Sequence, residues 1–273
     1  MRKALPFFVL TFAITWPCFF GAAELSLQPE TLNSWTRAIR LSLLLVGTFA
    51  PAIASLSLTF YKSGSTGLSK LFGRILQPDI ELRWYAFAVG FMAVIKIGVL
   101  FIHRAAFGTW PQISYAAIAA FLPALMISTP IQSGEELGWR GYALPRLVED
   151  LGFARASVLL GLIWGIWHMP LFFVAGMDHF GQSFPLFALG TTALSVAMTF
   201  LYSRTEGSLL LMMLMHSAVN QTVGILPQRG PEGSPFTLSG SPVMLLTLGL
   251  LWIAAAYFLV RMQQRSSAGR STP

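Results

Sequence analysis

The chain is a succession of apolar stretches, each about 16 to 23 residues long, that polar segments separate. A helix rises 1.5 Å per residue, so about 20 apolar residues cross the hydrocarbon core of a bilayer. This length predicts an all-α, polytopic membrane helix bundle with about eight transmembrane helices. The predicted spans are Leu5–Ala23, Ile39–Tyr61, Trp84–Ile102, Ser114–Thr129, Ser157–Val174, Phe184–Tyr202, Ser208–Val223 and Pro242–Val260.

Composition excludes an ordinary soluble domain. Charged residues make up 11% of the chain, where soluble domains contain about 25%, and the mean hydropathy is +0.65. We find no internal repeat, and we expect one transmembrane domain over residues 1–262, with its motifs in residues 114–224, and a polar C-terminal tail over 263–273. The first span is expected to be retained, because it is too long for a signal-peptide core. A kink is predicted at Pro51, and the segment from Lys62 to Arg83 is predicted to be a loop.

The distribution of Lys and Arg predicts the topology. With eight spans, 13 of the 18 basic residues fall on the side that holds both termini. Positive loops stay in the cytoplasm, so both termini are expected there, in a multi-pass protein of the plasma membrane. The net charge of +7 lies in short loops without a continuous basic patch, so no nucleic-acid partner is expected. The remaining basic residues are Arg37, Arg40, Arg104 and Arg229 on the other side and Lys96 within the third span.

The most unusual polar stretch runs from Gly134 to Arg146 and follows the fourth apolar run. Charges inside a membrane segment are costly and usually mark function. On a helix, Glu136 and Arg140 are four residues apart and form a favourable ion pair, while Glu135 is rotated by about 100°. One carboxylate is thereby neutralised, and Glu135 is left as a candidate general base. A solvated helix end is the structural alternative.

Two more polar sites lie in later spans. His168 is predicted in the middle of the fifth span, where Pro170 should open the helix beside the imidazole. His216 and Asn220 lie four residues apart in the seventh span, so they share one face. Each could be a packing or interhelical hydrogen-bonding residue. Together, on different helices, these sites predict a functional cavity.

A glutamate, two histidines and an asparagine can support amide hydrolysis without a covalent intermediate. The glutamate would deprotonate a water molecule, and imidazole and carboxamide donors would stabilise the oxyanion. The chain has no His-Glu-x-x-His motif, no aspartate within a span and no rhomboid-type serine motif. We expect no cofactor, although one glutamate and two histidines could bind zinc, which is a minor alternative.

The motifs resemble a known family. Glu-Glu-x-x-x-Arg at 135–140, an aromatic residue four before histidine at 164–168, and His-x-x-x-Asn at 216–220 occur in this order. They are similar to those of the CAAX protease and bacteriocin-processing family, membrane glutamic endopeptidases related to the Ras-converting CAAX protease. Trp164 stands where that family often has phenylalanine. The resemblance implies an eight-helix fold with a cavity open to the cytoplasm.

The resemblance also implies roles for the candidate residues. Glu135 would activate water with His168, His216 and Asn220 would form the oxyanion hole, and Glu136 would support the site with Arg140 and Trp164. The expected partners are the bilayer and a peptide or protein substrate, with or without a lipid. The substrate is left open. A non-proteolytic bacteriocin-immunity or scaffold protein and a proton-coupled transporter remain alternatives.

Overall fold

The computed structural model describes residues 2–26, 33–77, 79–174, 177, 179–230 and 233–268, with the side chains of residues 265–268 left aside. The described residues contain helices and no strands, which confirms the all-α class. In chain order the main helices are α1 (Leu5–Ser26), α2 (Ser34–Gly73), α3 (Leu82–Phe107), α4 (Tyr115–Ile131), α5 (Ser133–Gly138), α6 (Leu144–Trp167), α7 (Phe184–Arg204), α8 (Leu209–Ile225) and α9 (Pro242–Ala268).

The predicted spans correspond to these helices. Among the described residues, six helical runs are long and apolar enough to cross a membrane, and α8 is a shorter apolar helix. One of the six, Tyr115–Phe173, contains both the fourth and the fifth predicted span, because short helices link α4 to α6 without a polar loop. The polytopic bundle is therefore confirmed, and the count of eight holds approximately.

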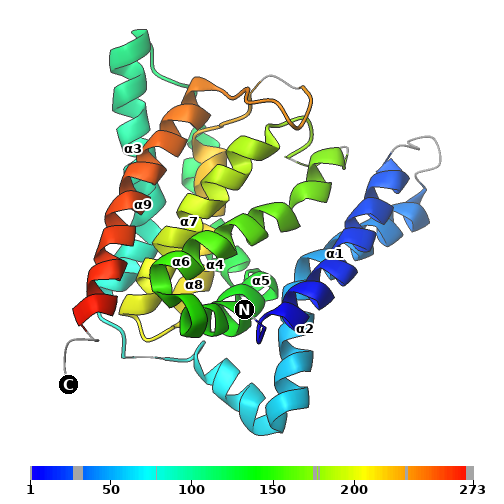
Figure 1. Ribbon diagram of the computed structural model, residues 1–273. Coiled ribbons are helices and arrows are strands. Elements are labelled where there is room, and N and C mark those ends of the chain that lie inside the picture. The colour runs from blue at the N-terminus through cyan, green and yellow to red at the C-terminus, as the bar shows by residue number, and fades with distance from the viewer. Residues whose placement is uncertain are drawn as a thin grey trace.

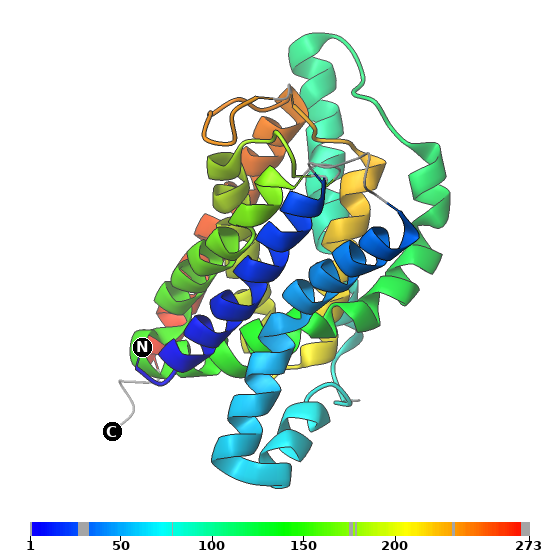
Figure 2. The ribbon, with the colours of Figure 1, turned by 90° about the vertical axis from the view of Figure 1, so that its right-hand side faces the viewer.

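The helices form a bundle in which α6, α7 and α8 lie centrally (Figure 1). α1 packs along α2 on one side, and α3 and α9 lie on the other (Figures 1 and 2). α5 is short and lies among α2, α4 and α8, which it contacts. The start of α1 and the end of α9 lie at the same end of the bundle, as an even number of spans requires (Figure 1). This end is called the basal end below.

Local sequence explains where several helices begin. The side chain of Asn33 accepts hydrogen bonds from the amides of Trp35 and Thr36 at 3.0 and 2.9 Å, and so caps α2. Ser114 caps α4 in the same way, through the amide of Ala117 at 3.2 Å. Such caps satisfy amides that have no partner within the helix, which matters where water is scarce.

Two glycines allow close approach between helices. A Cβ on Gly138 of α5 would lie 2.6 Å from the carbonyl oxygen of Pro51 on α2. On Gly161 of α6 it would lie 2.6 Å from the Cα of Thr192 on α7. Neither backbone atom can move aside easily, so both glycines allow packing that any larger residue would prevent. The first contact brings the buried glutamate segment against α2.

The predicted loop from Lys62 to Arg83 is wrong over its first half. α2 continues to Gly73, and it changes direction at Gly64, whose φ of 57° is the left-handed conformation that glycine adopts readily. The sharp change of direction at Gly64 is not predicted from the sequence, and Pro51, where a kink is predicted, lies within the helical part of α2 before it. Leu71 is buried with Leu137 and Leu209, and this packing holds residues 65–73 as a helical arm. The arm projects at the basal end (Figure 2).

The start of the fifth predicted span needs a similar correction. α6 begins at Leu144, 13 residues before the predicted Ser157, and bends at Gly152, where φ is 72°. At the other end of the chain, α9 extends to Ala268, and residues 269–273 of the predicted tail lie outside the described residues.

Candidate active site

The two adjacent glutamates lie on α5, between two breaks in helical geometry. α4 ends at Ile131, just after Pro130. α5 follows at once and continues into a π-helix, η2 (Trp139–Ala143). Single π-turns are rare and occur often at functional sites, because the wider turn redirects side chains. The exposed fraction is 7% for Glu135 and 0% for both Glu136 and Arg140, so this is an interior segment and not a solvated helix end.

Glu136 is held by two donors. Its Oε1 lies 2.8 Å from Nη1 of Arg140, at the predicted spacing of four residues, and 2.8 Å from Nδ1 of His216 on α8. A buried carboxylate requires such partners, because an uncompensated charge in a medium of low dielectric constant is very unfavourable. The three residues join η2 and α5 to α8. Glu136, Arg140 and His216 are called the buried ion cluster below.

Glu135 has a different environment. Its Oε2 accepts a hydrogen bond of 2.8 Å from the indole Nε1 of Trp164 on α6. Among the described residues, none donates to its Oε1. One carboxylate oxygen is therefore fixed by a neutral donor, and the other can receive a hydrogen bond from a water molecule or a substrate.

Trp164 lies between the two glutamates. The Cζ of Arg140 lies 4.5 Å from the centroid of its ring, a cation–π distance, and the ring of His216 meets it edge-on at 5.3 Å. The same indole thus binds Glu135 through its N–H group and packs on the buried ion cluster through its faces and edge. The motif requires only an aromatic residue at this position. The contact with Glu135 requires the indole N–H group, which phenylalanine does not have.

His168 lies at the end of α6, and not in the middle of a span as predicted. α6 stops at Trp167, and a 3₁₀-helix, η3 (Met169–Phe173), follows. Pro170 has no amide hydrogen to continue the α-helix, which explains the change. Nδ1 of His168 lies 2.8 Å from the carbonyl oxygen of Trp164. A carbonyl only accepts, so Nδ1 must donate, and Nε2 of the neutral ring is left as an acceptor.

Asn220 lies one turn beyond His216 on α8, as its spacing predicts. His216 is buried, whereas Asn220 is exposed. Among the described residues, none forms a hydrogen bond with its carboxamide. The fold therefore brings Glu135, Glu136, Arg140, Trp164 and His216 into contact and leaves Asn220 at the rim.

Two polar residues near the site are not identified from the sequence. Arg74, just after α2, donates to the carbonyl oxygen of Gly141 at 3.1 Å and to the Tyr202 hydroxyl at 2.8 Å. Arg74 thereby connects the arm of α2 to η2. The sequence gives no reason to select it, because it lies inside a predicted loop. His179 has its ring 6.0 Å from that of His168. The two histidines are 11 positions apart and lie on different segments, so the sequence carries no signal for this contact.

The donor set bears on the zinc alternative. Among the described residues, no group of three or more His, Cys, Asp or Glu side chains is arranged to hold a metal ion. The Nδ1 atoms of His168 and His216 are already used by a carbonyl and a carboxylate. Glu135 and His168 both contact Trp164, Glu135 through the indole N–H group and His168 through the backbone carbonyl oxygen.

The fold and the site together define a class: a polytopic helical membrane protein with buried acidic and imidazole groups on its central helices. Sequence comparison finds similar proteins. The sequence profile of the type II CAAX prenyl endopeptidase Rce1-like family matches residues 110–222, which contain all three motifs. The CAAX prenyl protease 2 of Methanococcus maripaludis is 28% identical over 227 residues, covering 78% of this chain and 81% of that protein. Over these residues the chain is similar to the Rce1-like CAAX prenyl endopeptidase family.

Proposed function

We propose that this protein is a membrane endopeptidase that hydrolyses a peptide bond with water activated by Glu135. The main observation in support is the unequal environment of the two glutamates. Arg140 and His216 donate to Glu136, while Glu135 keeps one oxygen without a donor among the described residues. A water bound there can transfer a proton to the carboxylate as it attacks a carbonyl carbon. The similarity of the chain to CAAX prenyl endopeptidases supports this reaction class.

His168 is proposed to orient the same water. Its Nδ1 donates to a backbone carbonyl, so Nε2 can accept the second hydrogen of the water. His216 and Asn220 are proposed to stabilise the oxyanion. His216 would donate from Nε2 in its doubly protonated form, and Asn220 offers an amide from the rim. The proposed mechanism needs no metal or other cofactor.

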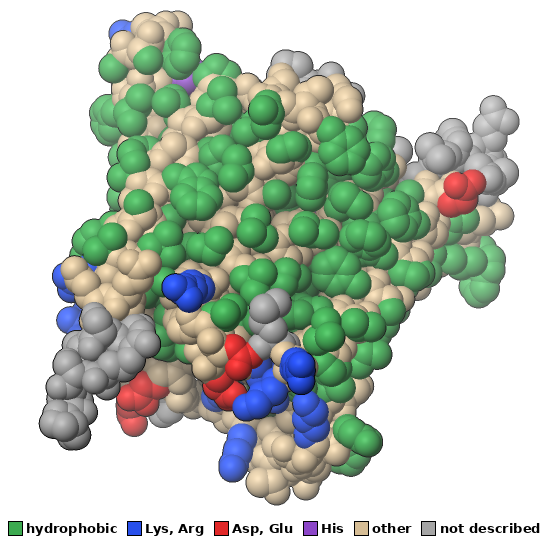
Figure 3. Space-filling view, in the orientation of Figure 1, with side chains coloured by type: hydrophobic (Ala, Val, Ile, Leu, Met, Phe, Trp, Pro, Cys, Tyr) green, Lys and Arg blue, Asp and Glu red, His purple; other side chains and the backbone are tan. Residues whose placement is uncertain are grey.

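The substrate is proposed to be a peptide that reaches the site from the cytoplasmic side of a plasma membrane. Lys and Arg side chains gather at the basal end of the bundle (Figure 3), where α1 begins and α9 ends. Positive residues favour the cytoplasm, so both termini are assigned to that side. The names of the related proteins refer to CAAX prenyl substrates, so a prenylated C-terminal peptide is the first substrate to test.

The test is cleavage of quenched fluorescent peptides, with and without a prenyl group, by the purified full-length chain. Glu135→Gln should lower kcat by about 10²- to 10⁴-fold, the usual contribution of a general base. Glutamine retains an oxygen that can accept from Trp164, so the variant should remain folded. Wild-type cleavage that survives in Glu135→Gln would refute the role of Glu135. Loss of wild-type cleavage with a chelator, restored by zinc, would refute the metal-free mechanism.

A non-proteolytic scaffold or immunity role makes the opposite prediction. In that case Glu135→Gln would preserve the biological effect, because the amide has the shape of the carboxylate. Substitutions that fill the space around Glu135 would then remove the effect while the protein remained folded.

A further inference from the structure

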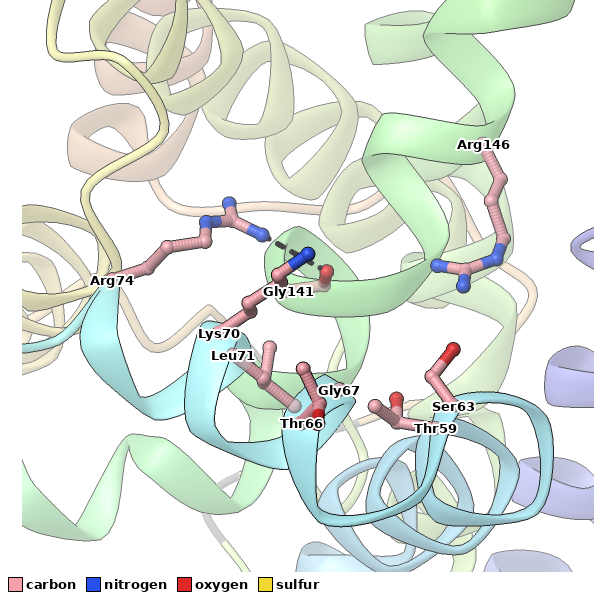
Figure 4. Close-up of a pocket in the computed structure, with 9 residues that line it drawn as sticks. All are labelled: Thr59, Ser63, Thr66, Gly67, Lys70, Leu71, Arg74, Gly141 and Arg146. Carbon is pink, nitrogen blue, oxygen red and sulfur yellow. Dashed lines mark hydrogen bonds between the residues drawn. The ribbon is translucent and has the colours of Figure 1, made fainter.

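A second polar site lies at the basal end, between the arm of α2 and the start of α6. It is a cavity of about 260 Å³, lined by residues on both sides of the kink at Gly64 and by η2 and α6 (Figure 4). A water molecule occupies about 30 Å³ in the liquid, so a group much larger than one water fits. The polar side chains that line the cavity are Lys70, Arg74 and Arg146, with the hydroxyls of Thr59, Ser63 and Thr66.

The lining contains three cations and no carboxylate. The Arg74 guanidinium donates to the carbonyl oxygens of Gly207, at 2.8 Å, and Gly141, and to the Tyr202 hydroxyl, all of which are neutral. These contacts fix its position and leave its charge uncompensated.

The other two cations are also short of negative charge. Arg146 donates to the carbonyl oxygen of Tyr142 at 2.7 Å and stacks on that ring, with Cζ 3.4 Å from the centroid. Glu149, one turn further along α6, attracts Arg146, but its carboxylate binds Lys3 at 2.8 Å. Lys70 is exposed, and no carboxylate of the described residues pairs with it. The cavity therefore presents a positive potential.

The cations approach the cavity from opposite walls. In Figure 4, Lys70 and Arg74 extend from the arm of α2, and Arg146 extends from α6 toward Ser63 and Thr59. Fixed guanidinium groups and hydroxyls around one space form the usual environment of a bound phosphate.

Exposed apolar side chains close in sequence to the lining residues point to the source of the anion. Phe60, Phe72 and Leu76 on or just after α2 have exposed fractions of 59%, 43% and 77%. A short helix with exposed apolar groups next to cations is typical of a segment that lies in the membrane interface. A free anion needs no such apolar flank, whereas a phospholipid provides both the phosphate and the acyl chains.

We infer that this cavity binds the phosphate headgroup of an anionic phospholipid in the membrane leaflet at the basal end. The three cations contact the phosphate, the hydroxyls donate to its oxygens, and the acyl chains extend past the exposed apolar residues of the arm. This site is separate from the proposed catalytic residues and does not depend on the proposed function. Its nearest link to them is the Arg140 backbone carbonyl, which lies 3.4 Å from Nη2 of Arg74.

The test uses the full-length chain in detergent and counts bound lipids by native mass spectrometry. The probes are short-chain phosphatidylglycerol, short-chain phosphatidylcholine and inorganic phosphate. Phosphatidylglycerol should bind with the highest affinity. Lys70→Gln and Arg146→Gln should each weaken its binding about fivefold, and the double variant about 25-fold, the usual effect of basic residues at a membrane surface. Arg155→Gln, which removes an exposed cation of α6 outside the cavity, is the matched control.

Arg146→Lys separates charge from packing, because it keeps the cation and loses the planar stack on Tyr142. It should retain most of the affinity that Arg146→Gln loses. Three results would overturn the inference: equal binding of phosphatidylcholine and phosphatidylglycerol, an equal loss in Arg155→Gln, or a failure of Arg146→Lys to restore binding. If inorganic phosphate bound as tightly as the lipid, the assignment to a phospholipid would be wrong.

Discussion

Glu135 and Glu136 are adjacent in the chain and buried on the same short helix, yet their carboxylates have different hydrogen-bond partners. Glu136 is wholly enclosed and receives two hydrogen bonds to a single oxygen, one from a guanidinium and one from an imidazole. Glu135 receives one hydrogen bond, from an indole. Glu136 is therefore fully engaged through one oxygen, whereas Glu135 keeps one oxygen without a donor among the described residues.

The strongest test of this comparison is the removal of the enclosed carboxylate. Glu136→Ala leaves Arg140 and His216 buried without a counter-charge, so it should lower the free energy of unfolding by about 3 to 5 kcal/mol. Glu135→Ala should lower it by about 1 to 3 kcal/mol, the usual result of leaving one buried donor, here Trp164, unpaired. Thermal unfolding of the two variants in detergent measures the difference. Equal destabilisation would mean that the two carboxylates have the same structural role.

Trp164→Phe tests what the single hydrogen bond to Glu135 contributes. It removes the only described donor to Glu135 and keeps most of the ring that packs on Arg140. Hydrogen bonds to charged groups contribute about 1.5 to 3 kcal/mol, so kcat should fall about 10- to 100-fold. The matched control is Trp167→Phe, in the same helix, which loses a hydrogen bond of 2.8 Å to the neutral Thr15 hydroxyl. A similar loss of kcat in both variants would show that the indole of Trp164 acts through packing alone.

Several features of the site follow from the sequence. The spacing of Glu136 and Arg140 predicts their ion pair, because residues four apart always face each other on a helix. The end of α6 before Pro170 follows from the missing amide of proline. These features depend on local geometry, so a single sequence is enough to predict them.

Contacts between distant segments could not be predicted in this way. The bond between His216 and Glu136 joins residues 80 positions apart, and that between Trp164 and Glu135 joins residues 29 apart. Both depend on how α6 and α8 pack around α5. The arm of α2 was missed for a related reason: its glycines, serines and lysine are typical of a loop, and burial of Leu71 against other helices overrides that preference.

The smallest expected effect concerns the arginine of the buried ion cluster. In Arg140→Lys, an ammonium group can still donate to Glu136, but it does not form the planar stack on Trp164. Nε and Nη2 of Arg140 have no partner among the described residues, so their loss should cost little. The variant should therefore lose about 1 kcal/mol of stability, the usual contribution of a cation–π contact.

Arg140→Met, which removes the charge and leaves Glu136 with His216 alone, is the companion variant and should lose about 3 kcal/mol or more. Chemical denaturation of both variants in mixed micelles gives the two values. If lysine were as damaging as methionine, the guanidinium geometry, and not its charge, would be what maintains Glu136. The contrast between the two glutamates would then rest on shape. If the lysine variant remains close to wild type, charge compensation alone distinguishes Glu136 from Glu135.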